Sequence, residues 1–296
     1  MDDLKRDAES LLTKTSLSDG VDRRDFLKVA LGSGFAVAAM PVMAQNVIKT
    51  DTAGLTAGTV TLTLTVDGQT VPVYRAQPEG KTNLPVVLVI SEIFGVHEHI
   101  ADVARRFAKL GYLALAPDLF VRQGDPQKSA SIADLQRDII SKTPDTQVMA
   151  DLDALVAWAK ANGGNPDKIA ITGFCWGGRV TWMYAAHNPS IKAGVAWYGR
   201  LVGTSNANTP TNPIDIAAKL NVPVLGLYGE KDTGITQDSI KAMQAMLAKG
   251  PNKSTFVIYP NSGHAFHADY RPSYVEADAK DGWGRMLAWF RQNGVA

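Results

Sequence analysis

The only cysteine of this 296-residue chain, Cys175, lies in the hexapeptide GFCWGG at residues 173–178. An apolar stretch at residues 169–172 precedes the hexapeptide, and a segment of helical periodicity follows it. The pattern G-x-C-x-G between a strand and a helix is typical of a nucleophile elbow, where glycines permit a strained turn that lifts the nucleophile above a sheet. The start of the following helix would favour the thiolate and offer backbone N–H groups to an oxyanion. A free cysteine can instead pack as a small buried hydrophobe, and this alternative stays open on the hexapeptide alone.

Two further residues complete a set that could activate the thiol. Asp232 follows the apolar stretch at residues 222–228, and His264 follows the one at residues 255–259. The order nucleophile, acid, histidine, with each residue after a strand, is that of α/β-hydrolases. The imidazole would take the proton of the thiol, and the carboxylate would orient the imidazole. Cys175, Asp232 and His264 are therefore predicted to form a catalytic triad.

Such a triad needs a sheet whose strands end on the same side. Continuous apolar runs, as expected for a parallel sheet covered on both faces, alternate with segments of helical periodicity. The strands are predicted at residues 84–90, 112–116, 169–172, 193–197, 222–228 and 255–259, and the helices at residues 100–110, 130–141, 146–162, 177–187, 237–249 and 274–292. A β-hairpin of residues 59–65 and 70–75, with a Val-Asp-Gly turn, precedes them. The predicted fold class is α/β, with the mostly parallel, doubly wound sheet of an α/β-hydrolase and a leading β-hairpin. The site is expected at the carboxyl ends of the strands.

Composition narrows the class of function. The 30 Lys and Arg residues nearly balance the 29 Asp and Glu residues, so the sequence favours a small-molecule partner over a nucleic acid. One cysteine excludes an internal disulfide and metal sites built from several cysteines, and no cofactor is predicted. Thiol exchange would need a second, resolving cysteine, which the chain lacks.

Residues 1–44 are predicted to be an export signal. A polar start leads to the paired Arg23 and Arg24, and an apolar run at residues 29–44 ends in a small residue. This order is typical of a twin-arginine signal, so we expect the export machinery as a partner and a periplasmic location. The apolar run is shorter than the roughly 20 residues of a membrane-spanning helix, and a membrane tether formed by an uncleaved segment is the alternative. Residues 45–296 are then one catalytic domain.

The chain resembles the dienelactone hydrolase (carboxymethylenebutenolidase) family, a cysteine-dependent branch of the α/β-hydrolases. The matching segments, spread over nearly the whole mature chain, are SEIFGV at residues 91–96, APDLFVRQG at 116–124, GFCWGG at 173–178, WYG at 197–199, YGEKD at 228–232 and SGHAF at 262–266. The resemblance implies hydrolysis of an enol-lactone or a related ester through a thioester on Cys175.

The resemblance also implies roles outside the triad. Glu92 would engage the thiol and help to form the thiolate once substrate binds. The backbone N–H groups of Ile93 and Trp176 would bind the oxyanion. Arg122 matches the family's carboxylate-binding arginine, whose planar guanidinium can make two parallel hydrogen bonds, and Tyr198 would line the pocket.

One position departs from the family pattern. The family has a second substrate-binding arginine four residues after the histidine, whereas this chain has Ala268 there and its nearest arginine is Arg271. The departure favours a neutral or larger lactone or ester over dienelactone itself.

Two other classes of function compete with a hydrolase. The histidines of His97-Glu98-His99 and of His264-x-x-His267 could ligate a metal ion, but neither spacing is that of a zinc-protease motif, and no metal site is predicted. A non-catalytic periplasmic small-molecule-binding protein on a hydrolase scaffold is the alternative to an enzyme. Turnover of an activated ester separates the enzyme from the binding protein, and sensitivity to a chelator identifies a metal.

Overall fold

The computed structural model of the chain describes residues 48–63, 68–251 and 253–296, so the predicted export signal lies outside the described residues. The described chain begins with the predicted hairpin. Its strands, β1 (Leu55–Thr63) and β2 (Thr70–Pro78), pair in antiparallel register with Thr63 opposite Thr70. The hairpin is therefore confirmed, while most of its predicted turn, at residues 66–68, falls outside the described residues.

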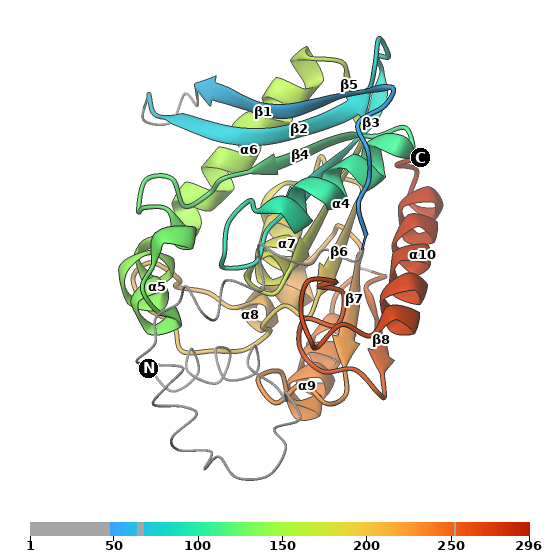
Figure 1. Cartoon of the computed structure of the whole chain (residues 1–296). Helices are drawn as coiled ribbons and strands as arrows, with labels where there is room; N and C mark the ends of the chain where they lie inside the picture. Colours follow the sequence, from blue (N-terminus) through green and yellow to red (C-terminus); the bar gives the residue numbers. More distant parts are fainter. Residues whose placement is uncertain (1–47, 64–67, 252) are drawn as a thin grey trace.

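The hairpin forms one edge of an eight-stranded sheet with the order β1-β2-β4-β3-β5-β6-β7-β8 (Figure 1). The other strands are β3 (Leu84–Ile90), β4 (Leu113–Pro117), β5 (Gly164–Phe174), β6 (Ala193–Trp197), β7 (Val224–Gly229) and β8 (Thr255–Tyr259). Only β2 runs against its neighbours, because it pairs antiparallel with both β1 and β4 and all later pairs are parallel. The predicted mostly parallel sheet is therefore confirmed.

Helices cover both faces of this sheet (Figure 1). On one face α4 (Glu98–Lys109) meets α10 (Glu276–Gln292), where the ring centroids of Phe107 and Trp283 lie 4.8 Å apart. On the other face α6 (Asp145–Ala161) meets α7 (Trp176–His187), where the Tyr184 hydroxyl donates to Asp153 at 2.9 Å. The shorter elements are the helices α5 (Ile132–Asp138), α8 (Pro213–Ile216) and α9 (Gln237–Leu247) and the 3-10 turns η1 (Pro126–Lys128), η2 (Ile140–Lys142) and η3 (Ala217–Lys219).

Several elements differ from the sequence-based expectation. Strand β1 starts at Leu55 instead of residue 59, and β2 extends to Pro78 instead of residue 75. Strand β5 starts at Gly164 instead of residue 169, because Gly164 pairs with Leu84 at the start of β3. Residue types that favour turns lie between residues 164 and 169, so the sequence pattern did not indicate the longer strand. The helix predicted over residues 130–141 divides into α5 and the 3-10 turn η2.

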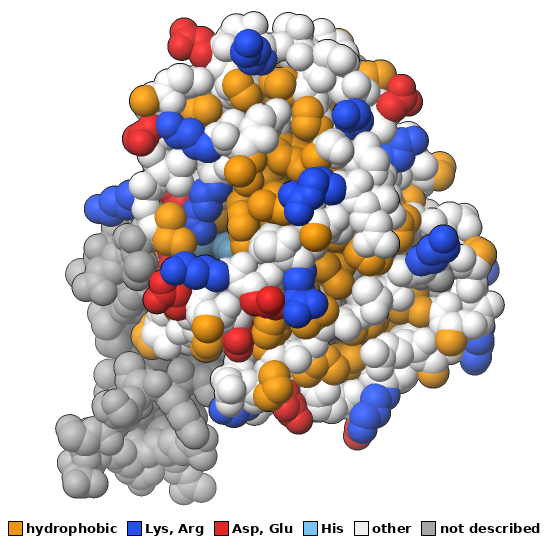
Figure 2. All heavy atoms as spheres, turned by 90° about the vertical axis from the view of Figure 1, so that its right-hand side faces the viewer, with side chains coloured by type: hydrophobic (Ala, Val, Ile, Leu, Met, Phe, Trp, Pro, Cys, Tyr) orange, Lys and Arg blue, Asp and Glu red, His pale blue; other side chains and the backbone are white. Residues whose placement is uncertain are grey.

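Coverage on both faces explains the apolar strands. Every residue of β4, β6 and β7 is buried, which is the pattern of a sheet without a solvent-facing side. On the side of the molecule that carries α10, Lys and Arg side chains are scattered among hydrophobic ones, without an extended surface of one sign (Figure 2). Within the described ranges, no helix combines the length and apolar character needed to cross a membrane.

Candidate active site

Cys175 occupies the sharp turn between β5 and α7 that the elbow pattern predicts. Its backbone has φ 55° and ψ −113°, a conformation that costs a non-glycine residue roughly 1–3 kcal/mol. The backbone N–H of Cys175 donates to the carbonyl oxygen of Trp197 at 3.0 Å, which ties the turn to the end of β6. The structure thus places the cysteine in a strained position at the head of a helix.

Close backbone contact explains the glycines that flank this cysteine. A β-carbon on Gly173 would lie 2.1 Å from the carbonyl oxygen of Gly177. A β-carbon on Gly177 would lie 2.4 Å from the carbonyl oxygen of Ile90 at the end of β3. Real β-carbons do not approach backbone oxygens so closely, so α7 can start against the ends of β5 and β3 only if these positions are glycines.

His264 and Asp232 form a buried pair beside this turn. The Nδ1 atom of His264 lies 2.7 Å from Oδ2 of Asp232. The other carboxylate oxygen of Asp232 accepts the backbone N–H groups of Gly234 at 2.9 Å and Ile235 at 3.0 Å. The acid is therefore held by its own loop, after β7, and it orients the histidine, which follows β8.

The electrostatic environment of His264 connects it to the cysteine. Burial alone would lower the pKa of His264, but the Asp232 carboxylate and the Cys175 side chain raise this pKa well above its ordinary value. The Nε2 atom of His264 is buried and makes no hydrogen bond of normal geometry with another described residue. The structure therefore brings Cys175, Asp232 and His264 together and favours an imidazolium beside the sulfur.

Glu92 lies directly after β3 and is almost fully buried, with 1 % of its surface exposed. Its Oε2 atom accepts a hydrogen bond from the Tyr270 hydroxyl. Its Oε1 atom is buried and has no hydrogen-bond partner among the described residues. Because buried polar atoms are usually paired, this oxygen is available to a proton donor such as a thiol.

The two predicted oxyanion donors are the backbone N–H groups of Ile93 and Trp176, which lie where α7 packs against the end of β3. Ile93 follows Glu92 after the end of β3, and Trp176 is the first residue of α7, which packs against that end. Neither backbone N–H donates to a backbone oxygen of another described residue. Both groups can therefore serve an oxygen of another molecule.

Tyr198 also reaches this site. It has φ 39°, and its ring centroid lies 5.1 Å from that of His264. Its hydroxyl is buried without a hydrogen-bond partner in the described part of the chain. Burial, followed by the charges of Glu92, Tyr270 and Cys175, raises the pKa of Tyr198 well above its ordinary value, so this phenol stays protonated.

Arg122 is placed differently from what the family pattern suggests. Its guanidinium makes two hydrogen bonds to the Asp151 carboxylate of α6, at 2.7 Å and 3.0 Å, and both side chains are largely buried. A guanidinium that binds a carboxylate of its own chain is a weaker candidate for binding a second one. The predicted role of Arg122 in substrate binding stays a prediction, which the KM of an Arg122→Ala variant for an anionic substrate would test.

The arginine that does lie near the nucleophile is Arg271. Its guanidinium carbon lies 4.8 Å from the ring centroid of Phe94 and 5.1 Å from that of Tyr270. Burial opposes its charge, but the charges of Tyr270 and Glu92, with a smaller contribution from Cys175, raise the pKa of Arg271 further. The sequence analysis noted Arg271 only for its position in the chain and missed Tyr270.

A cluster of histidines lies behind Tyr270. The ring centroid of His99 lies 6.1 Å from that of His97 and 5.7 Å from that of His267, and its Nδ1 atom lies 2.8 Å from Oδ1 of Asp269. Both ring nitrogens of His97 are buried and unpaired within the described residues. Across the described ranges, no group of three or more His, Cys, Asp or Glu side chains could hold a metal ion.

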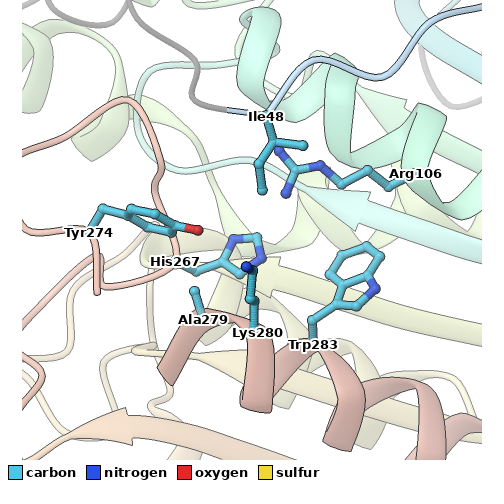
Figure 3. Close-up of a pocket in the computed structure, with 7 residues that line it drawn as sticks. All are labelled: Ile48, Arg106, His267, Tyr274, Ala279, Lys280 and Trp283. Carbon is cyan, nitrogen blue, oxygen red and sulfur yellow. The ribbon is translucent and has the colours of Figure 1, made fainter. Parts of the chain in front are cut away.

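A separate cavity of about 200 Å³ borders this cluster at His267. Figure 3 shows the imidazole of His267 pointing into it between Tyr274 and Trp283. The other lining residues are Ile48, Arg106, Ala279 and Lys280. None of the predicted catalytic residues lines this cavity, so it is distinct from the candidate active site.

The sheet and the residues at its strand ends define an α/β-hydrolase. Within this class the chain belongs to the dienelactone hydrolase family, whose sequence profile matches residues 71–294. The expected family membership is therefore confirmed, and the protein is a carboxylic ester hydrolase of this family.

Similar proteins are known from several bacteria. A protein of Methylorubrum extorquens, provisionally named a carboxymethylenebutenolidase, is 54 % identical over 291 residues, which are 98 % of this chain and 98 % of the relative. A protein of Salmonella typhimurium with the same provisional name is 53 % identical over 263 residues, which are 88 % of this chain and 96 % of the relative. A crystal structure from Klebsiella pneumoniae, provisionally named a dienelactone hydrolase, is 53 % identical, covers 80 % of this chain and 99 % of its own, and has a TM-score of 0.78.

The histidine cluster predicts a loss of stability in acid. Burial, together with the charges of His99 and Arg271, lowers the pKa of His97 well below its ordinary value, and burial with His99 and Arg106 does the same for His267. Folded His97 and His267 thus stay neutral at pH values where the unfolded chain binds protons. Their contribution to stability is complete above about pH 6.5 and falls below it, by up to about 1.4 kcal/mol per pH unit for each histidine.

We expect His97→Leu to reduce the loss of unfolding free energy between pH 7.5 and pH 5.5 by about 1 kcal/mol. Urea unfolding of the variant and the parent protein at both pH values measures this difference. His187→Gln, at an exposed histidine of α7, is the control and should keep the parent's acid loss. An acid loss in His97→Leu equal to that of the parent would contradict the explanation.

Proposed function

We propose that the protein hydrolyses lactones and esters through a covalent thioester on Cys175, with His264 and Asp232 as the other members of a triad. The observation that carries this proposal is the strained Cys175 at the head of α7, beside a histidine that is oriented at 2.7 Å by a buried carboxylate. The charges of Cys175 and Asp232 both favour the imidazolium form of His264. This is the charge distribution of a thiolate–imidazolium pair.

The first half of the reaction forms the thioester. The thiol proton passes to His264, and the sulfur attacks the carbonyl carbon of the substrate, forming a C–S bond. The backbone N–H groups of Ile93 and Trp176 stabilise the resulting oxyanion. When the C–O bond of the ester breaks, His264 gives its proton to the leaving oxygen, and the acyl group stays on Cys175.

The second half of the reaction restores the enzyme. His264 takes a proton from water, and the hydroxide attacks the thioester carbonyl. The C–S bond breaks, and the thiolate leaves beside the protonated histidine. Glu92 assists the first half, because its unpaired Oε1 can accept a hydrogen bond from the thiol before the proton passes to His264.

The electrostatics of the pocket suggest how the substrate is chosen. Arg271 carries a positive charge close to Glu92 and Cys175, whereas Arg122 is paired with Asp151. Glu92 offsets part of the charge of Arg271. We therefore propose activated neutral esters and lactones as substrates, with an anionic lactone as the comparison that tests the contribution of Arg271.

We expect Cys175→Ala to reduce turnover of both kinds of substrate by several orders of magnitude, because the covalent nucleophile is lost. The assay uses a neutral ester and an anionic lactone, with circular dichroism to show that the variant folds. Substantial turnover by a folded Cys175→Ala protein would rule out the thioester. Tight substrate binding without turnover by the parent protein would instead support the non-catalytic binding protein.

We also propose that residues 1–44 direct export through the twin-arginine machinery to the periplasm. The paired Arg23 and Arg24 before an apolar run support this proposal. We expect replacement of both residues by Lys to retain the protein in the cytoplasm, as measured by cell fractionation and immunoblotting. Undiminished periplasmic protein from the Lys-Lys variant would exclude twin-arginine export, and membrane-bound parent protein would indicate an uncleaved tether.

A further inference from the structure

Tyr270 is a buried residue that contacts Glu92 and has no role in the proposed mechanism. It lies six residues after His264 in the chain, and only 3 % of its surface is exposed. Its hydroxyl donates to Oε2 of Glu92 across a sequence separation of 178 residues. This side chain therefore joins the loop after β8 to the carboxylate after β3.

Two imidazoles fix the ring of Tyr270. The ring centroid of His97 lies 4.9 Å from that of Tyr270, and the ring centroid of His99 lies 5.1 Å from it, both in edge-to-face geometry. Edge-to-face contacts of this kind restrict rotation as well as adding packing energy. The hydroxyl therefore has little freedom to leave the carboxylate.

The imidazole of His99 is itself held in place by Asp269. Asp269 accepts a hydrogen bond from Arg106 at 2.9 Å and pairs with Nδ1 of His99 at 2.8 Å. Burial alone would raise the pKa of Asp269, but the hydrogen bond and charge of His99 and the charge of Arg106 lower it, so this carboxylate stays ionised. The histidine cluster thus acts as a rigid support for Tyr270.

The direction of the hydrogen bond to Glu92 follows from the charge state of Tyr270. Burial and the charge of Glu92 raise the pKa of Tyr270 well above its ordinary value, although Arg271 opposes this shift. The phenol is therefore protonated throughout the working pH range. A protonated phenol has a proton to donate, so its hydroxyl is the donor in the hydrogen bond to Oε2 of Glu92.

We propose that Tyr270 is the positioning residue for Glu92, which it holds so that Oε1 faces the thiol of Cys175. The proposal rests on the proposed cysteine mechanism. Oε2 is occupied by Tyr270, and Oε1 is the buried carboxylate oxygen that has no partner in the described residues. A carboxylate that rotated freely could offer either oxygen to the thiol or neither.

Several other titratable groups surround Glu92 and Tyr270. They come from the strand-end loops, from α4 and from the loop after β8. They are Cys175, Tyr198, His264, Arg271, His97, His99 and Asp269. A pH profile alone would mix their effects, so the test compares variants that differ at single hydroxyl and carboxyl groups.

The test is kcat/KM for Tyr270→Phe on a neutral activated ester, measured with Glu92 in place and in the Glu92→Gln background. Without the hydroxyl, the Glu92 carboxylate loses the hydrogen bond that orients it. At the pH optimum of the parent, kcat/KM should fall roughly tenfold to a hundredfold, the range for a hydrogen bond to a charged group. Tyr274→Phe, at a half-buried tyrosine that lines the separate cavity, is the matched control and should keep the parent kcat/KM.

The Glu92→Gln background separates positioning from a merely structural role. Glu92→Gln removes the carboxylate that Tyr270 positions, so adding Tyr270→Phe to Glu92→Gln should lower kcat/KM by less than about threefold. A loss that is as large in the Glu92→Gln background as in the parent would overturn the proposal. If Cys175→Ala is inactive and Tyr270→Phe keeps the parent kcat/KM, this inference fails while the proposed function stands; turnover by Cys175→Ala removes both.

A second measurement covers the case in which Tyr270→Phe does not fold. Infrared difference spectra between the parent protein and Glu92→Gln identify the signal of the Glu92 carboxyl group. Incorporation of 3-fluorotyrosine, whose hydroxyl is a stronger hydrogen-bond donor, should shift this signal in the parent protein. An unchanged Glu92 signal would contradict a hydroxyl that holds the carboxyl group in place.

Discussion

The backbone contact that holds Cys175 in its strained conformation is the constraint on which the rest of the site depends. Helix α7 can begin directly behind the sulfur only because Gly173 and Gly177 leave no β-carbon between the helix and the ends of β5 and β3. The same closeness recurs at the end of β6, where a β-carbon on Gly199 would lie 2.3 Å from the carbonyl carbon of Gly178. Tyr198, the residue before Gly199, is strained as well, with φ 39°. The two strained residues therefore result from one tight junction between α7 and three strands, and buried strands supply the rigidity that maintains it.

The polar chemistry of the site follows from this junction. Three buried atoms make no hydrogen bond of normal geometry within the described residues, namely Oε1 of Glu92, the hydroxyl oxygen of Tyr198 and Nε2 of His264. Each such atom costs about 1–3 kcal/mol if nothing hydrogen-bonds to it. They are held near Cys175 by partners on their other sides, such as Asp232 for His264 and Tyr270 for Glu92. A thiol or a substrate ester can form hydrogen bonds with the atoms that the fold leaves unpaired. The rigid scaffold thus gives up some folding stability and keeps these atoms available for the reaction.

The sequence predicted the parts of the molecule in which local pattern and burial agree. The bounds of β3, β6 and β8 were predicted correctly. For β3 and β6 the reason is burial, since a continuous apolar run is what a strand covered on both faces requires. Cys175, Asp232 and His264 could be selected because each follows such a strand. The start of β5 was wrong, because Gly164 belongs to the strand through its pairing with Leu84 and not through its own residue type.

Long-range polar pairs had no such signal. Arg122 pairs with Asp151 on α6. The sequence has many acidic residues in helices, and nothing in the residue type or position of Asp151 indicates which arginine it pairs with. Tyr270 and Glu92 are 178 residues apart, and neither residue type nor spacing connects them. The position of Arg271 beside Glu92 likewise depends on the path of the loop after β8, which sequence periodicity does not describe.

The central claim is that Cys175 carries the acyl group during turnover. The most direct measurement is mass spectrometry of protein quenched in acid during turnover of a slowly hydrolysed ester, followed by proteolysis and peptide sequencing. The account predicts a mass increase equal to the acyl group on the peptide that contains Cys175, lost on treatment with hydroxylamine at neutral pH as expected of a thioester. An acyl group on any other residue, or active protein that turns over the ester while its Cys175 is fully alkylated, would contradict it.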